Sequence, residues 1–162
     1  MGSRKSVSIG GLRIGGGVPV RVESMLKTRL TDIEGCAAET EALAAAGCEL
    51  ARAALPDERL AASFAELIKK SVLPLMADIH FDHRLALAAL KAGCRAIRIN
   101  PGNMSGSAGL AEVIAAAKDT GAVIRIGANG GSLNNAQMEA GGRQGSGARP
   151  RRRRTAQAAH KK

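Results

Sequence analysis

The sequence predicts an α/β protein, part of a TIM (β/α)₈ barrel with about five parallel strands and four helices, followed by a disordered basic tail. Short runs rich in Ile, Val, Leu and Ala alternate with helical patterns of roughly 10 to 15 residues, which is typical of βα units and a parallel sheet. The unit repeats about every 23 to 28 residues, a spacing that suits a barrel, although a doubly wound sheet has the same periodicity. The pattern stops after the fifth strand, so part of a barrel is predicted.

The N-terminal elements are a hairpin, a strand and a capped helix. Glycines punctuate the segment 7–17 and predict a short hairpin, and the segment 18–24 is strand-like. Thr31 and Glu34 form a capping box, which predicts the start of a helix that ends at Gly47.

The later elements repeat the βα unit. A strand is expected over 48–55, and Pro56 suits the first turn of a helix over 57–70. The same alternation then predicts a strand over 73–80, a helix over 82–93 capped by Asp82, a strand over 94–100, a helix over 109–121 and a strand over 122–129.

Polar side chains gather near the C-terminal ends of these strands. Residues i and i+2 of a strand share a face, so Asp78 and His80 lie together, opposite Ala77 and Ile79. The same parity places five further polar residues of neighbouring strands near that end of the inner face: Arg52, Arg98, Asn100, Arg125 and Asn129. Barrel active sites lie at this end of the strands.

The three arginines of this set need partners, because an unpaired buried guanidinium is costly. The guanidinium fork suits phosphate oxygens, so the sequence predicts a pocket for a multiply phosphorylated small molecule. A structural alternative stays open, in which the arginines form ion pairs with Asp78 and Glu23 inside the barrel.

No metal site is predicted. The carboxylates and histidines between residues 78 and 83 resemble a metal cluster, but Asp82 is more simply a helix cap and no H-x-H pair is present. The three cysteines, Cys36, Cys48 and Cys94, form no C-x-x-C pair and are expected to be small buried side chains in a reducing compartment.

Composition excludes several function classes. Residues 134–162 hold eight Lys or Arg and one Glu, so the net charge of +10 leaves the first 133 residues with 16 basic and 13 acidic side chains, or +3. The tail is either an arm that binds nucleic acid non-specifically or, as we favour, the product of out-of-frame translation. Two Phe and no Trp or Tyr leave few aromatic rings for base stacking. No membrane span or signal peptide is predicted, so the expected location is the cytoplasm.

Three motifs carry a family resemblance. The segments 77–93 (ADIHFDHRLALAALKAG), 98–103 (RINPGN) and 124–133 (IRIGANGGSL) resemble the 4-hydroxy-3-methylbut-2-enyl diphosphate synthase family. These are the iron–sulfur oxidoreductases of the methylerythritol phosphate route to isoprenoids (terpenoids). VESM and ARAALPD match as well, and the resemblance runs from about residue 6 to Leu133.

The resemblance implies a cytoplasmic, homodimeric barrel enzyme that reductively opens a cyclic diphosphate, 2-C-methyl-D-erythritol 2,4-cyclodiphosphate. It implies a [4Fe–4S] cluster on a separate C-terminal domain, with flavodoxin or ferredoxin as the electron donor. It assigns diphosphate binding to Arg52, Arg98, Arg125 and Asn129, with Asp78, His80 and Asn100 lining the pocket.

Departures from the family limit what the chain is expected to do. Glu23 stands where the family usually has glutamine, and nothing after Leu133 matches. We therefore assign residues 1–133 to the N-terminal part of the barrel and 134–162 to the tail, and expect the family's acid–base glutamate and the cluster domain to be absent. No catalytic residue and no cofactor is assigned to this chain. A half barrel with two unpaired edges is expected to be marginally stable or aggregation-prone, and inactive alone.

Two other function classes stay open. One is another phosphate- or pterin-binding TIM-barrel enzyme, such as a relative of dihydropteroate synthase, which would have no cluster domain. The other is a nucleic-acid-binding protein, whose binding would depend on salt and on residues 143–162.

Overall fold

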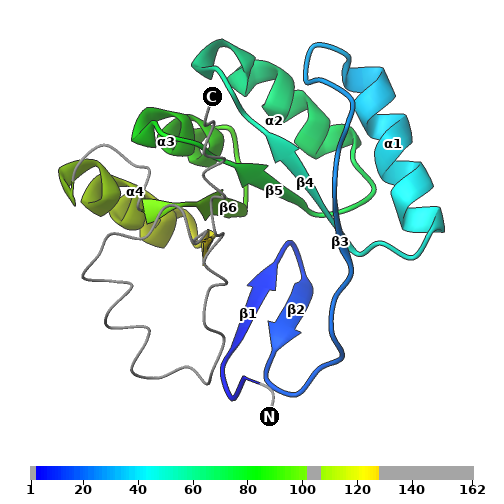
Figure 1. Ribbon diagram of the computed structural model, residues 1–162, viewed down its shortest axis with the longest axis horizontal. Coiled ribbons are helices and arrows are strands. Elements are labelled where there is room, and N and C mark those ends of the chain that lie inside the picture. Colours follow the sequence, from blue (N-terminus) through cyan, green and yellow to red (C-terminus); the bar gives the residue numbers. More distant parts are fainter. Residues whose placement is uncertain (1–2, 102–106, 128–162) are drawn as a thin grey trace, which may run out of the picture. The chain divides into compact units, whose positions relative to one another are not determined.

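The computed structural model describes residues 3–101 and 107–127, and these form a curved parallel sheet with helices on one face (Figure 1). The five strands are hydrogen-bonded in chain order: β3 (Glu23–Met25), β4 (Leu50–Ala54), β5 (Leu75–Asp78), β6 (Ala96–Ile99) and β7 (Val123–Ile126). A doubly wound sheet would reverse its strand order and carry helices on both faces. The predicted α/β class and the partial barrel are therefore confirmed.

Helices cover the convex face of the sheet. They are α1 (Ile33–Ala45), α2 (Ala61–Lys70), α3 (His83–Lys91) and α4 (Ser107–Thr120), with a 3₁₀ turn, η1 (Glu58–Leu60), before α2. One face of the strands supplies small and branched residues to the core: Ala51, Ala53, Ala77, Ile79, Ile97 and Ile99. The helices supply Phe64, Leu67, Ala86, Ala89, Leu90 and Val113. The predicted apolar face of each strand is thus the helix-facing one.

The helix boundaries correct two predictions. Asp32, not Thr31, caps α1, because its carboxylate accepts a hydrogen bond of 2.9 Å from the backbone N–H of Gly35. Pro56 does not open α2: Asp57 caps the intervening 3₁₀ turn, and the α-helix begins at Ala61. In each region two adjacent residues can begin a helix, Thr31 and Asp32 or Pro56 and Asp57, and in each the second residue is the cap.

The predicted cap of α3 and the predicted ends of α1 and α3 are confirmed, whereas α4 begins at Ser107, two residues before the predicted start. The carboxylate of Asp82 accepts a hydrogen bond of 2.9 Å from the N–H of Arg84 at the start of α3. Gly47 and Gly93 follow α1 and α3 with φ of 87° and 95°, the left-handed conformation that glycine adopts readily at a helix end.

The predicted N-terminal hairpin lies against the concave face. Strands β1 (Ser6–Ile9) and β2 (Leu12–Gly15) pair in antiparallel fashion. The buried side chain of Ile9 packs against Leu50, Met76 and Ala96, which lie near the N-terminal ends of β4, β5 and β6. The hairpin therefore covers the apolar N-terminal half of the concave face, and it is the C-terminal half that carries polar side chains.

The edges and the cysteines agree with expectation. In the described part of the chain, β3 and β7 each pair along one side only, so both are edge strands. All three cysteines are buried and free. No helix in this part is long and apolar enough to cross a membrane. Asn129 and the tail 134–162 lie outside the described residues, so the assignments made for them stay predictions.

Candidate functional site

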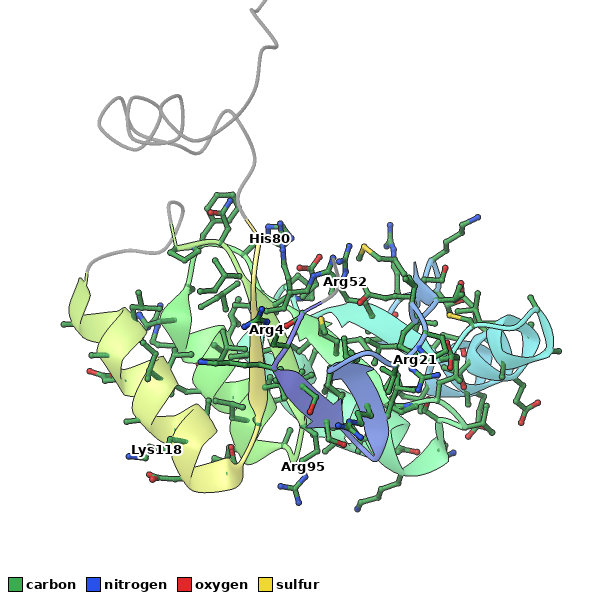
Figure 2. All side chains as sticks on the ribbon, turned by 90° about the horizontal axis from the view of Figure 1, so that it is seen from below. Arg4, Arg21, Arg52, His80, Arg95 and Lys118 are labelled. Carbon is green, nitrogen blue, oxygen red and sulfur yellow. The ribbon has the colours of Figure 1, made fainter. Side chains whose placement is uncertain are left out.

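Three neighbouring strands place charged residues side by side. Asp78 of β5 is in register with Arg98 of β6, and Arg98 is in register with Arg125 of β7. Adjacent strands lie about 4.8 Å apart, so two guanidinium groups in a row would repel each other without negative charge between them. Figure 2 shows Arg52 and His80 at the C-terminal end of the strands and Arg95, which precedes β6, at the opposite end. We call the cluster of charged side chains formed by Glu23, Arg52, Asp78, His80, Arg98 and Arg125 the charged edge.

Asp78 is the first of two carboxylates that pair with the arginines of the charged edge. Its side chain is only 5% exposed. Oδ1 lies 3.2 Å from Nη1 of Arg98, and Oδ2 lies 3.3 Å from Nε2 of His80 and 3.7 Å from Nε of Arg52. A buried carboxylate is stabilised by such cationic and hydrogen-bonding partners. Asp78 thus links three of the predicted site residues.

Glu23 is the second carboxylate, and it pairs with Arg52 and Arg125. Nη1 of Arg125 donates to Oε1 and Oε2 of Glu23 at 2.6 and 2.7 Å, and Nη1 of Arg52 donates to Oε1 at 3.0 Å. This contact joins the first and last strands of the sheet. In a flat sheet β3 and β7 would lie about 19 Å apart, well beyond the reach of these side chains. The ion pair therefore spans the interior of a strongly curved sheet, as expected for part of a barrel.

The arginines are paired by side chains of the chain itself. The structural alternative considered from the sequence is thus realised, because Asp78 and Glu23 serve all three guanidinium groups. Three arginines and two carboxylates still leave an excess of one positive charge when His80 is neutral. Arg125 is 48% exposed, so its guanidinium is accessible to a ligand. The edge can therefore accept a further anion.

The two asparagines of the predicted site have different outcomes. Asn100 follows β6 and is buried at the same end of the sheet as Arg98. Asn129 lies outside the described residues. The structure therefore brings together Arg52, Asp78, His80, Arg98 and Arg125, with Asn100 nearby in the chain.

Two features of this edge were not found from the sequence. Phe81 has a φ of 63°, the one positive value among the described residues other than glycine, and its ring is tilted at 5.9 Å from the ring of His80. Such a backbone costs about 1–3 kcal/mol and often occurs at functional sites. At Gly127, a Cβ would lie 2.5 Å from Nε of Arg98, so any other residue there would force this guanidinium to shift.

The cysteines do not fit an iron–sulfur cluster. Cluster ligands are thiolates. Burial raises the pKa of the Cys36 and Cys94 thiols, which disfavours that form. Sγ of Cys94 donates to the carbonyl oxygen of Ala96 at 2.9 Å, and Sγ of Cys48 donates to that of Leu50 at 3.1 Å. Within the described ranges, no group of three or more His, Cys, Asp or Glu side chains could hold a metal ion.

The fold and this edge define a class, a TIM-barrel protein whose charged side chains collect where barrel enzymes have their active sites. The family model described as the GcpE TIM-barrel domain matches residues 4–153. The chain belongs to this family. The match extends past Leu133, where the motif resemblance ends.

Curated relatives are named 4-hydroxy-3-methylbut-2-en-1-yl diphosphate synthase (flavodoxin). The protein of Maridesulfovibrio salexigens is 48% identical over 134 residues, which are 83% of this chain and 37% of that protein. The protein of Bacillus subtilis is 46% identical over 135 residues, 83% of this chain and 36% of that protein. The chain thus spans little more than a third of the length of these relatives.

A solved structure shares the fold. Dihydropteroate synthase of Yersinia pestis matches with a TM-score of 0.60 and 15% identity, over 86% of this chain and 53% of that one. At this identity the likeness shows the barrel fold alone. The family match and the much higher identity to the diphosphate synthases therefore favour the synthase family over the dihydropteroate synthase alternative.

Proposed function

We propose that this chain is the substrate-binding part of a 4-hydroxy-3-methylbut-2-en-1-yl diphosphate synthase, and that Arg52, Arg98 and Arg125 bind the diphosphate of the cyclic substrate. The observation that carries the proposal is the convergence of three guanidinium groups on two carboxylates, with Asp78, Arg98 and Arg125 in register near the C-terminal ends of their strands. The names of the relatives support the reaction, and the cyclic diphosphate is the substrate that the family resemblance implies.

The geometry gives each arginine a distinct part in this binding. Arg98 is 14% exposed and fixed by Asp78 on one side, so its remaining N–H groups are oriented before the ligand arrives. Arg125 is the most exposed of the three and closes on the second phosphate group. Asp78 orients Arg52, Arg98 and His80, and we assign it a positioning role. Asn100 and Asn129 complete the proposed lining of the pocket.

The reductive step belongs to the rest of the synthase. In the family a [4Fe–4S] cluster supplies the electrons when bound, and flavodoxin, named with the relatives, is the proposed donor. The cysteines of this chain do not fit the cluster. We assign to this chain the binding and orientation of the substrate. The resemblance further supports a cytoplasmic homodimer.

Calorimetric titration with 2-C-methyl-D-erythritol 2,4-cyclodiphosphate tests the proposal. Arg98→Gln removes a charge-assisted contact worth about 1.5–3 kcal/mol, so the affinity should fall at least about tenfold. Arg21→Gln is the matched control, because Arg21 also forms an ion pair, 2.6 Å from Glu49, outside the charged edge. Equal binding by Arg98→Gln and Arg21→Gln would overturn the proposal.

A further inference from the structure

We propose that Glu23 is an internal anion that occupies the place of one phosphate group between Arg52 and Arg125 and so limits the affinity of the site for diphosphate. The inference rests on the proposed function and deepens it, because it names the residue of this chain that competes with the ligand. Glu23 is then a determinant of affinity rather than a group that takes part in the reaction.

Glu23 accepts hydrogen bonds from two arginines, as a phosphate group bound between them would. Both carboxylate oxygens accept from Nη1 of Arg125, at 2.6 and 2.7 Å, and Oε1 also accepts from Nη1 of Arg52. Guanidinium groups bind carboxylates and phosphates with the same planar geometry. A phosphate group that binds Nη1 of both Arg52 and Arg125 therefore competes with Glu23 for these N–H groups.

Glu23 can be displaced more easily than Asp78. The Glu23 side chain is 21% exposed and its partner Arg125 is half exposed, so solvent can replace part of what the carboxylate loses. Asp78 is nearly buried and has three partners, so its removal from Arg98 would leave an uncompensated buried charge. An incoming anion thus exchanges with Glu23 and leaves Asp78 in place.

The exchange lowers the affinity in two ways. The contacts between Glu23 and the two arginines must break, and the carboxylate then remains near a ligand of the same charge. Glutamine at this position keeps the size of the side chain and one acceptor oxygen but removes the charge. The excess positive charge of the edge would rise from one to two, which favours anion binding.

Titration calorimetry with inorganic diphosphate at fixed ionic strength tests this inference. Glu23→Gln should bind diphosphate about tenfold or more tightly than the unchanged chain, because one like charge within contact distance is removed. Glu49→Gln is the matched control, since Glu49 also pairs with an arginine, Arg21, but outside the charged edge. Its affinity should stay within about twofold of the unchanged chain.

The outcomes separate this inference from the proposed function. If Arg98→Gln weakens binding but Glu23→Gln binds no more tightly than Glu49→Gln, the internal anion is refuted and the diphosphate site stands. If Arg98→Gln binds diphosphate as tightly as the unchanged chain, and the double variant Arg98→Gln/Glu23→Gln binds it as tightly as Glu23→Gln alone, the proposed function fails. Glu23→Met, uncharged and of similar length, must give the same tightening. It replaces Glu23→Gln if circular dichroism shows that the glutamine variant is unfolded.

Discussion

Replacing Asp78 by asparagine removes the central negative charge of the edge while preserving the shape of the side chain. Loss of one partner from a fully buried ion pair costs about 3–5 kcal/mol. The cost is lower here, because Arg52 keeps Glu23 and the new amide oxygen can still accept from Arg98. We expect a loss of about 2 kcal/mol, which for a domain of this size lowers Tm by about 6 to 10 °C.

Thermal unfolding followed by far-UV circular dichroism at low protein concentration measures this effect. Asp57→Asn is the matched control, because its ion pair with Arg59 is exposed and asparagine caps a helix as well as aspartate does. The control should leave Tm unchanged. If Asp78→Asn melts with the control, or above it, the charged edge does not stabilise the curved sheet and the reasoning is wrong.

Three further predictions concern the packing, the pH dependence and the thiols. Gly127→Ala would force the Arg98 guanidinium to move, so the affinity for diphosphate should fall at least about fivefold with no change in helix content, and unchanged affinity would contradict this. Hydrogen bonds from Arg84 lower the pKa of Asp82 from 3.8 to about 2. The contribution of ionised Asp82 to stability is therefore complete above about pH 4 and is lost as the pH falls to about 2. NMR titration should show the pKa of Asp82 rising towards 3.8 in Arg84→Gln, and a pKa near 4 in the unchanged chain would refute the prediction. Burial raises the pKa of the Cys36 thiol, so thiol reagents should react with it only after unfolding, and fast reaction of the folded chain would refute its burial.

Strand periodicity was enough to predict which residues share the concave face. Because side chains alternate strictly along a strand, Asp78, Arg98 and Arg125 could be placed on one face from the sequence, and the observed register brings them side by side. The class of fold followed from the same alternation of strands and helices, and the strand order confirms it.

The sequence left the pairing of the arginines with Asp78 and Glu23 as one of two alternatives, and strand periodicity alone could not decide between them. Glu23 and Arg125 are 102 residues apart and meet because the sheet curves. The alternation of residues within one strand does not determine how strongly the sheet curves. The hairpin covers the N-terminal half of the concave face through Ile9, which contacts residues of three strands, and this too is a tertiary contact. The left-handed backbone of Phe81 depends on the turn after β5, and its residue type gave no sign of it.

The most direct test of the account is a crystal structure of this chain with 2-C-methyl-D-erythritol 2,4-cyclodiphosphate. The account predicts phosphate oxygens within hydrogen-bonding distance of Arg98 and Arg125, with Asp78 still bound to Arg98 and Glu23 moved away from Arg125. A ligand bound elsewhere, with both carboxylates still holding the arginines, would contradict the account.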